Sequence, residues 1–156
     1  MSPQPLDLTL GLSDEETATL LALGVPTAVV RGETLFRLGA AADALYVVER
    51  GRIVLTLPMH IRDGEEQVVV EEKQPGDTLG WSGLVAPHRF TLNATAAVAS
   101  ELRVFPRMVL LDHFRAHPSV GCRVMQNVAA VIGHRLQVFQ TMWLREVQRA
   151  VELRYA

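Results

Sequence analysis

"GDTLGWSGLVAPHRFTLNATAAVA", Gly76 to Ala99, is the stretch on which the fold assignment turns. Its first half is rich in glycine and small hydroxyl residues, and its second half contains Asn-Ala-Thr-Ala. Such a composition is typical of a backbone loop that cradles a phosphate group between two strands. Arg89 is the only arginine or lysine in the stretch. The loop therefore has the outline of an anion site but few of the charges that such a site uses.

Short β-rich runs separated by turn residues surround this loop between residues 27 and 105. Asp63-Gly64 between two of the runs is a strong hairpin signal. In the run 52–59, Ile53, Leu55, Leu57 and Met59 alternate with smaller or more polar neighbours, which predicts a half-buried strand. Eight runs at this spacing predict a jelly roll, a double-stranded β-helix, in an α+β chain that is mainly β. The runs are 27–31, 34–38, 44–49, 52–59, 67–73, 78–81, 93–99 and 101–105.

Helical patterns flank the strands on both sides. Ser13 and Glu16 have capping-box spacing, which predicts a short helix over about 14–23 that ends at Gly24 and Pro26. The segment 107–117 predicts a second short helix, which stops before Pro118 because a residue that precedes proline avoids helical angles. A long helix is predicted from Ser119 almost to the end. We therefore divide the chain into a sensor domain, 1–118, and a C-terminal dimerisation helix, 119–156.

The composition excludes several classes of protein. Nearly half of the 156 residues are hydrophobic (49%), which supports a packed core rather than disorder. The formal net charge of -2 gives no overall basic signature of a nucleic-acid binder. The single cysteine, Cys122, allows no intramolecular disulfide and agrees with a cytoplasmic location. We expect no signal peptide at the N-terminus and no membrane span, since no apolar stretch reaches about 18 residues.

The order of these elements resembles the cyclic-nucleotide-binding domain of the catabolite-activator family and of cyclic-nucleotide-regulated kinases and channels. The resemblance covers roughly residues 12–145 and rests on the order and spacing of several motifs. These are "GETLFRLGAAADALYVVERGRIVL" (32–55), "PGDTLGWSGLV" (75–85), "ATAAVASELRVF" (94–105) and "HPSVGCRVMQNVAAVIGHRL" (117–136).

The resemblance also implies a ligand site, the phosphate cassette. In family members that bind cyclic AMP or GMP, a glutamate accepts the ribose hydroxyl and an arginine pairs with the cyclic phosphate. The matching positions here hold Trp81 and Leu92, so the cassette is degenerate. Arg89 is the only nearby cation that could substitute. The predicted ligand-binding residues are Leu79, Gly80, Trp81, Ser82, Gly83, Leu84, Arg89, Leu92, Ala94 and Thr95.

These residues favour a non-enzymatic sensor or regulatory module whose small-molecule ligand is unknown or absent. The alternative is a functional cyclic-nucleotide receptor that uses Arg89 and loop backbone amides. A purely structural dimerisation protein is a further option. A jelly-roll metalloenzyme of the cupin type would need a histidine and glutamate cluster on its strands, and none is present. His113 and His117 have i, i+4 spacing, but no third ligand joins them, so we expect no cofactor and no metal.

The long helix carries an apolar series with the spacing of a coiled-coil seam, formed by Ile132, Leu136, Phe139 and Trp143. The series predicts a homodimer, and an unidentified protein partner is also possible. In the regulators that the chain resembles, a helix-turn-helix domain follows this helix. Only about 20 residues follow Leu136, so we expect a stand-alone module that does not bind DNA by itself.

Overall fold

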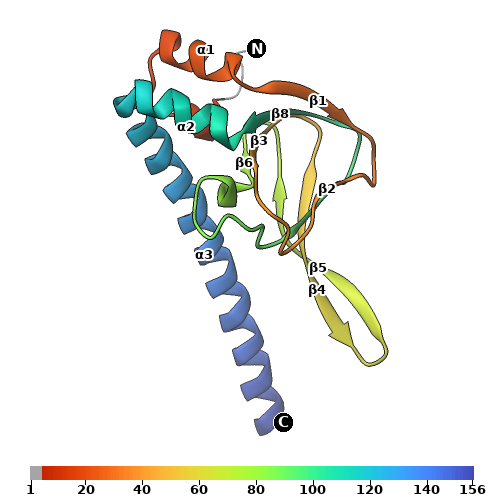
Figure 1. Ribbon diagram of the computed structural model, residues 1–156. Helices are drawn as coiled ribbons and strands as arrows, with labels where there is room; N and C mark the ends of the chain where they lie inside the picture. Colours follow the sequence, from red (N-terminus) through yellow and green to blue (C-terminus); the bar gives the residue numbers. More distant parts are fainter. Residues whose placement is uncertain (1–4) are drawn as a thin grey trace.

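The computed structural model describes residues 5–156, and its strands form two four-stranded antiparallel sheets of a jelly roll (Figure 1). One sheet has the order β1-β8-β3-β6 and the other β2-β7-β4-β5. The predicted fold class and all eight predicted strands are confirmed. The strands are β1 (Val25–Val29), β2 (Thr34–Phe36), β3 (Ala44–Arg50), β4 (Ile53–Ile61), β5 (Gly64–Lys73), β6 (Thr78–Leu79), β7 (Asn93–Ala96) and β8 (Ser100–Pro106).

A bulge interrupts the pairing of β4 with β5. Leu55 pairs with Glu71 and Thr56 pairs with Val69, so Val70 is an extra residue on β5. A bulge of this kind shifts the inward and outward alternation of the side chains that follow it. The shift matters for the ligand site because Glu71, on the strand of the bulge, becomes an inward-facing charged residue.

Beyond the bulge, β4 and β5 continue as a two-stranded ribbon that projects from the roll (Figure 1). Ile61 pairs with Gly64 at its tip, which confirms the hairpin predicted from Asp63-Gly64. The prediction that the inward face of β4 continues to Met59 was wrong, because Met59 is exposed. The alternation in the sequence continues, but no second sheet covers the ribbon at this distance from the roll.

The helices match their sequence signals closely. Helix α1 (Asp14–Ala22) begins with the predicted capping box, in which the Glu16 amide donates to Ser13 Oγ over 3.1 Å. It ends before Pro26, which lies in the edge strand β1, a position where proline is tolerated. Helix α2 spans Arg107–Ala116. Helix α3 (Pro118–Tyr155) starts with proline in its first turn, which needs no amide donor there.

Two hydrophobic clusters form the core. The first lies between the two sheets and includes Phe36, Leu55 and Phe90. The second lies where the N-terminal segment, α2 and α3 pack against the roll, and includes Val120, Val124 and Val128 of α3 among its buried residues. The first half of α3 is thus part of the core, whereas its second half extends past the roll (Figure 1). Within residues 5–156, no helix is long and apolar enough to cross a membrane.

Two turn glycines allow a direct test of backbone strain. Gly32 and Gly51 both have positive φ angles, +85° and +91°. A Cβ at Gly32 would meet nothing within 4 Å, whereas a Cβ at Gly51 would lie 2.7 Å from Cα of Ser100. We expect Gly32→Ala to lower the free energy of unfolding by about 1–2 kcal/mol through the left-handed conformation alone. Gly51→Ala should cost about 1–3 kcal/mol more because the backbone must also move.

Urea unfolding followed by circular dichroism measures both changes. Equal losses of unfolding free energy in the two variants would contradict this expectation, because they would show that the close contact with Ser100 adds no energetic cost.

Candidate ligand site in the loop after strand β6

The loop that follows β6 keeps the compact backbone that its glycines predict. Gly80 has a φ of 76°, and the one-turn helix η2 (Trp81–Gly83) follows it directly. A Cβ at Gly83 would lie 2.8 Å from the carbonyl oxygen of Ala44, so only glycine fits this position without movement. His88 Nδ1 lies 3.0 Å from the Ser82 carbonyl oxygen and fixes the far side of the turn.

The cavity beneath this loop is very small. Its volume is about 10 Å³, roughly one water-sized site. Phe36 and Phe90 both line it and stack in parallel with ring centroids 3.8 Å apart, and both side chains are buried. The cavity is lined by Phe36, Leu55, Gly80, Trp81, Ser82, Phe90, Thr91, Leu92 and Arg135. Most of its wall is therefore apolar, and the roll's own side chains occupy the space beneath the loop.

Four of the ten predicted site residues line this cavity, namely Gly80, Trp81, Ser82 and Leu92. Trp81 also packs against the cluster formed by α2 and α3, and thereby joins the loop to the helices. Of the other predicted residues, the side chains of Leu79 and Ala94 belong to the core between the sheets, and Leu84 to the helical cluster. Thr95 lines a groove on the sheet β2-β7-β4-β5, away from the cavity.

Arg89 binds the turn at Gly39 and not the cavity beneath the loop. Its Nη1 donates to the Gly39 carbonyl oxygen over 2.9 Å, and its backbone forms an isolated bridge with Ala41. The side chain is exposed and does not line the cavity.

The cation that reaches the cavity is Arg135 of α3, which the sequence analysis did not select. Its Nε donates to Glu71 Oε2 over 2.6 Å. Lys73 Nζ lies 2.9 Å from the other oxygen of the same carboxylate. The three side chains are only 5–9% exposed, so they form a buried ion cluster between β5 and α3.

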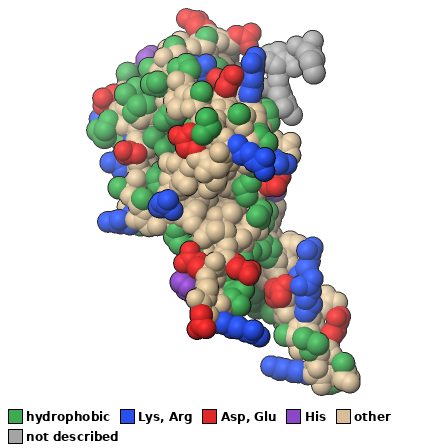
Figure 2. All heavy atoms as spheres, turned by 90° about the vertical axis from the view of Figure 1, so that its right-hand side faces the viewer, with side chains coloured by type: hydrophobic (Ala, Val, Ile, Leu, Met, Phe, Trp, Pro, Cys, Tyr) green, Lys and Arg blue, Asp and Glu red, His purple; other side chains and the backbone are tan. Residues whose placement is uncertain are grey.

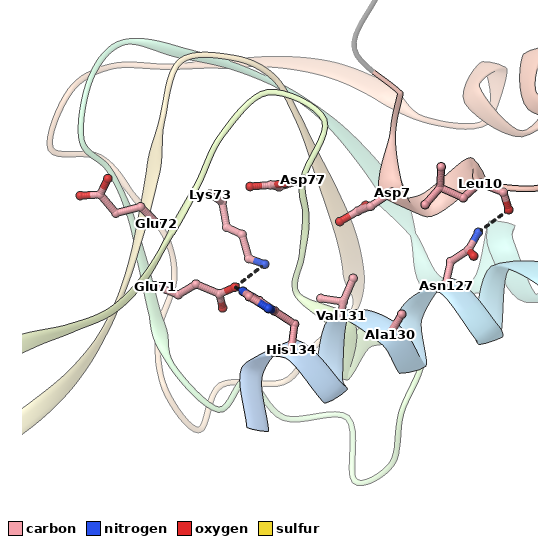
Figure 3. A pocket seen from close by; sticks show the side chains of 10 residues that line it. All are labelled: Asp7, Leu10, Glu71, Glu72, Lys73, Asp77, Asn127, Ala130, Val131 and His134. Carbon is pink, nitrogen blue, oxygen red and sulfur yellow. Dashed lines mark hydrogen bonds and ion pairs between the residues drawn. The ribbon is translucent and has the colours of Figure 1, made fainter. Parts of the chain in front are cut away.

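A pocket of about 330 Å³, most of whose lining residues are polar, lies beside this cluster (Figure 3). Glu71 and Lys73 of β5 face His134 of α3 at one end, and Asp7 and Asn127 lie toward the other. The N-terminal segment is tied to the pocket wall, because Asn127 Nδ2 donates to the carbonyl oxygens of Leu8 and Leu10. The lining comprises Asp7, Leu10, Glu71, Glu72, Lys73, Asp77, Asn127, Ala130, Val131 and His134.

Two carboxyl groups of this pocket have opposite pKa shifts. Burial raises the pKa of Asp7 above its usual 3.8, although Thr78 donates two hydrogen bonds to it. Burial acts in the same direction on Glu71, but the hydrogen bonds and charges of Lys73 and Arg135 outweigh it and lower the pKa of Glu71 below 4.5. Glu71 is therefore an ionised carboxylate at neutral pH.

A sequence signal for Arg135 existed. It occupies a position on the helix face that buries Val124, Val128 and Val131, where an apolar residue is expected. A charged residue on such a face indicates a buried partner. No comparable signal identifies that partner as Glu71. The local sequence pattern does not predict the bulge in β5 that directs the Glu71 side chain toward α3.

The predicted dimer residues divide between two faces of α3. Ile132 packs against the helical cluster and Phe139 against the core between the sheets, each being partly buried. Leu136 and Trp143 point to solvent and are 58% and 66% exposed. The exposed apolar side is therefore a narrower stripe than the sequence series suggests.

His113 and His117 lie together at the end of α2, with ring centroids 4.5 Å apart. Partial burial, and then the neighbouring charge of His117, lower the pKa of His113. Within residues 5–156, no group of three His, Cys, Asp or Glu side chains is placed to hold a metal ion.

The comparisons with known proteins agree with this fold. The profile of the family described as "Cyclic nucleotide-binding domain" matches residues 26–117. The N-terminal domain of a transcriptional regulator from Streptomyces coelicolor A3(2) is 27% identical, with a TM-score of 0.69, over 82% of this chain and 89% of that chain. No curated protein sequence matches the chain.

Two full-length regulators are also similar. The catabolite activator protein of Thermus thermophilus is 25% identical, with a TM-score of 0.72, over 91% of this chain but only 63% of its own length. The c-di-GMP responsive global regulator CLP of Xanthomonas campestris is 18% identical, with a TM-score of 0.75, over 85% of this chain and 64% of its own. At that identity the likeness to CLP shows the fold alone.

Neighbouring glutamates test the importance of the buried ion cluster. Removing one partner of a buried ion pair costs about 3–5 kcal/mol, so Glu71→Gln should lower the free energy of unfolding by that amount at neutral pH. Glu72→Gln is the matched control, because Glu72 pairs with Arg52 at 3.8 Å on the surface and such a pair contributes about 0–1 kcal/mol.

The pH dependence adds a second readout. Because the folded-state pKa of Glu71 is lowered, its stabilisation is present above pH 4.5 and is lost as the pH falls through the folded-state pKa. Urea unfolding should therefore show that the free energy of unfolding of wild type falls between neutral and acidic pH. The fall should be smaller in Glu71→Gln. Equal stability of the two glutamate variants at neutral pH would contradict the cluster's role.

Proposed function

The chain belongs to the cyclic nucleotide-binding domain family, and from this premise we propose that it is a non-enzymatic regulatory module whose cassette is closed to cyclic AMP and cyclic GMP. The observation that carries the proposal is the cavity of about 10 Å³ beneath the cassette loop. A small-molecule ligand site usually measures about 300–1,000 Å³. A nucleotide could enter only after aromatic side chains of the roll had moved.

The chemistry of the wall supports the same proposal. Leu92 stands at the position where the family's arginine pairs with the cyclic phosphate, and its side chain is buried. Trp81 stands at the position of the glutamate that accepts the ribose hydroxyl. A hydrogen bond to a charged group contributes about 1.5–3 kcal/mol, so losing two of them lowers affinity by on the order of 10²-fold or more.

The second candidate is a cyclic-nucleotide receptor that uses Arg89. The arginine is near the loop in sequence, but its hydrogen bond to Gly39 directs it outward. To reach a bound phosphate, Arg89 would have to leave this acceptor and turn toward the loop. The geometry therefore favours the closed module over the receptor.

We expect isothermal calorimetry of ligand-free protein to detect no binding of cyclic AMP or cyclic GMP in the low micromolar range. The physical reason is the absence of both charged contacts together with the filled cavity. Low-micromolar binding that is lost in Arg89→Ala would replace the closed module with the Arg89 receptor. Arg37→Ala, which alters another exposed arginine near the roll, is the matched control and should change nothing.

A homodimer through α3 is the second part of the proposal. Leu136 and Trp143 form an exposed apolar stripe, and the exposed Val147 extends it by about one turn. Large side chains of this type anchor protein interfaces. An exposed stripe on the part of the helix that extends past the roll is better explained by a partner than by packing within the chain.

Leu136→Asp should convert a micromolar dimer into a monomer in sedimentation velocity, because it places a charge within the stripe. Gln148→Asp is the control, since Gln148 is exposed and lies about 120° around the helix from Leu136. A wild-type monomer at micromolar concentration, or dissociation by both substitutions alike, would refute the proposed interface.

Charge on the distal part of α3 supports the proposal that this chain does not bind DNA by itself. Arg149 pairs with Glu146 at 3.1 Å, so part of the positive charge there is balanced. On the face drawn in Figure 2, basic and acidic side chains are interspersed rather than gathered into one basic region. We further propose that the chain is a cytoplasmic regulator without catalytic activity.

A further inference from the structure

The pocket of Figure 3, which we call the outer pocket, is separate from the cassette and large enough for a small organic molecule. Its volume of about 330 Å³ lies within the usual range of ligand sites, roughly 300–1,000 Å³. Its lining residues come from the N-terminal segment, from β5 and the turn after it, and from α3 (Figure 3). The outer pocket and the cassette cavity share no lining residue.

Hydrogen bonds hold the walls of the outer pocket in place without a ligand. On one side, Asn127 Nδ2 donates to the carbonyl oxygens of Leu8 and Leu10 over 2.8 and 2.9 Å. Next to it, the Thr78 amide donates to Asp7 Oδ2 over 3.0 Å. The N-terminal segment is therefore fixed to both α3 and β6, and a ligand would enter a site that is already formed.

The charged groups of the outer pocket are unevenly distributed. Four carboxyl groups line it, those of Asp7, Glu71, Glu72 and Asp77, against one lysine and one histidine. The positive groups gather at Glu71, because its carboxylate has nitrogens within 4 Å from Lys73, Arg135 and His134. The other end of the pocket is left with an excess of negative charge.

Asp7 and Asp77 form that negative end, on the wall that faces α3 (Figure 3). Among residues 5–156, neither carboxylate has a cationic nitrogen within 4 Å, and Asp77 Oδ2 accepts only from the Gln74 amide, over 2.8 Å. Burial raises the pKa of Asp7, and the charge of Asp77 acts in the same direction. The hydrogen bonds from Thr78 and the charge of Lys73 oppose this rise only in part.

The rest of the outer pocket suits an organic cation better than a metal ion. Leu10, Ala130 and Val131 give it an apolar wall beside the two carboxylates. In the part of the chain that the structure describes, no three His, Cys, Asp or Glu side chains are close enough together to hold a metal ion. Acceptors on one side and apolar carbon on the other match a molecule with one charged end.

From these observations we propose that the outer pocket binds a small organic monocation, a primary ammonium group on a short alkyl chain. The ammonium lies between Asp7 and Asp77, and the alkyl chain packs on Ala130 and Val131. An ammonium group has three donors and no acceptor, so it suits a site whose free polar groups are acceptors. The bound cation contacts the N-terminal segment, the turn after β5 and α3 together. The inference does not depend on whether the cassette is closed.

The probe is n-butylammonium chloride, compared with n-butanol and sodium n-butyrate at equal ionic strength. The neutral and anionic compounds have the same four-carbon chain, so they isolate the contribution of the positive charge. At ten times its Kd, butylammonium should raise the thermal midpoint of the full chain by about 3–6 °C, because a ligand that binds the folded state stabilises it. Butanol and butyrate should give no comparable rise.

Two substitutions locate the binding. Asp77→Asn removes one charge but keeps an oxygen that can accept from the Gln74 amide, and it should weaken butylammonium binding by about tenfold. Ala130→Leu fills the apolar wall from an exposed helical position that tolerates leucine, and it should abolish the response. Asp63→Asn, which changes an exposed carboxylate at the hairpin tip, is the matched control and should keep the full response.

Three results would overturn the inference. One is the lack of any rise with butylammonium at millimolar concentrations, and another is an equal rise with butanol, which would show that the carboxylates contribute nothing. The third is a response that both Asp77→Asn and Ala130→Leu retain in full, because binding would then lie outside the outer pocket. Each result leaves the closed cassette untouched, since cyclic-nucleotide calorimetry tests that proposal separately.

Discussion

The carboxylate of Glu71 is the buried polar contact between the roll and the long helix. It accepts from Lys73 on its own strand and from Arg135 on α3, and all three groups are buried. Desolvating three charges is expensive, and their attraction repays the cost only in good geometry. The bulge at Val70 supplies that geometry, because it turns Glu71 inward beside the helix. This contact holds Arg135 below the cassette, on a helix that the hydrophobic clusters also pack against the roll.

The side chains around Arg135 also explain why the cavity beneath the cassette loop is small. The loop keeps the glycine-dependent turn of the family, with Gly80 in the left-handed conformation. Phe36 and Phe90 fill the interior below it, and the buried Leu92 lines the same cavity. Trp81 closes the loop against the helices. The fold of the family is therefore retained, and we propose that its cassette is closed to cyclic nucleotides.

Much of this fold could be predicted from local sequence. Period-two runs, the Asp63-Gly64 turn and the capping box at Ser13 are local signals, and each identified its element. The resemblance also put Trp81 and Leu92 at the family's glutamate and arginine positions, and that assignment stays a prediction. The contact between Glu71 and Arg135 was not, because it joins residues 64 positions apart through a bulge and one face of a helix. The exposure of Met59 escaped prediction for a related reason, since strand periodicity does not indicate where the opposing sheet ends.

A crystal structure of the protein grown with saturating cyclic AMP tests the central claim most directly. The account predicts that Phe36 and Phe90 remain stacked, that Trp81 stays against the helical cluster and that Arg135 keeps its contact with Glu71, with no nucleotide beneath the loop. A nucleotide bound there, with its phosphate on the loop backbone and Arg89 or Arg135, would contradict the account.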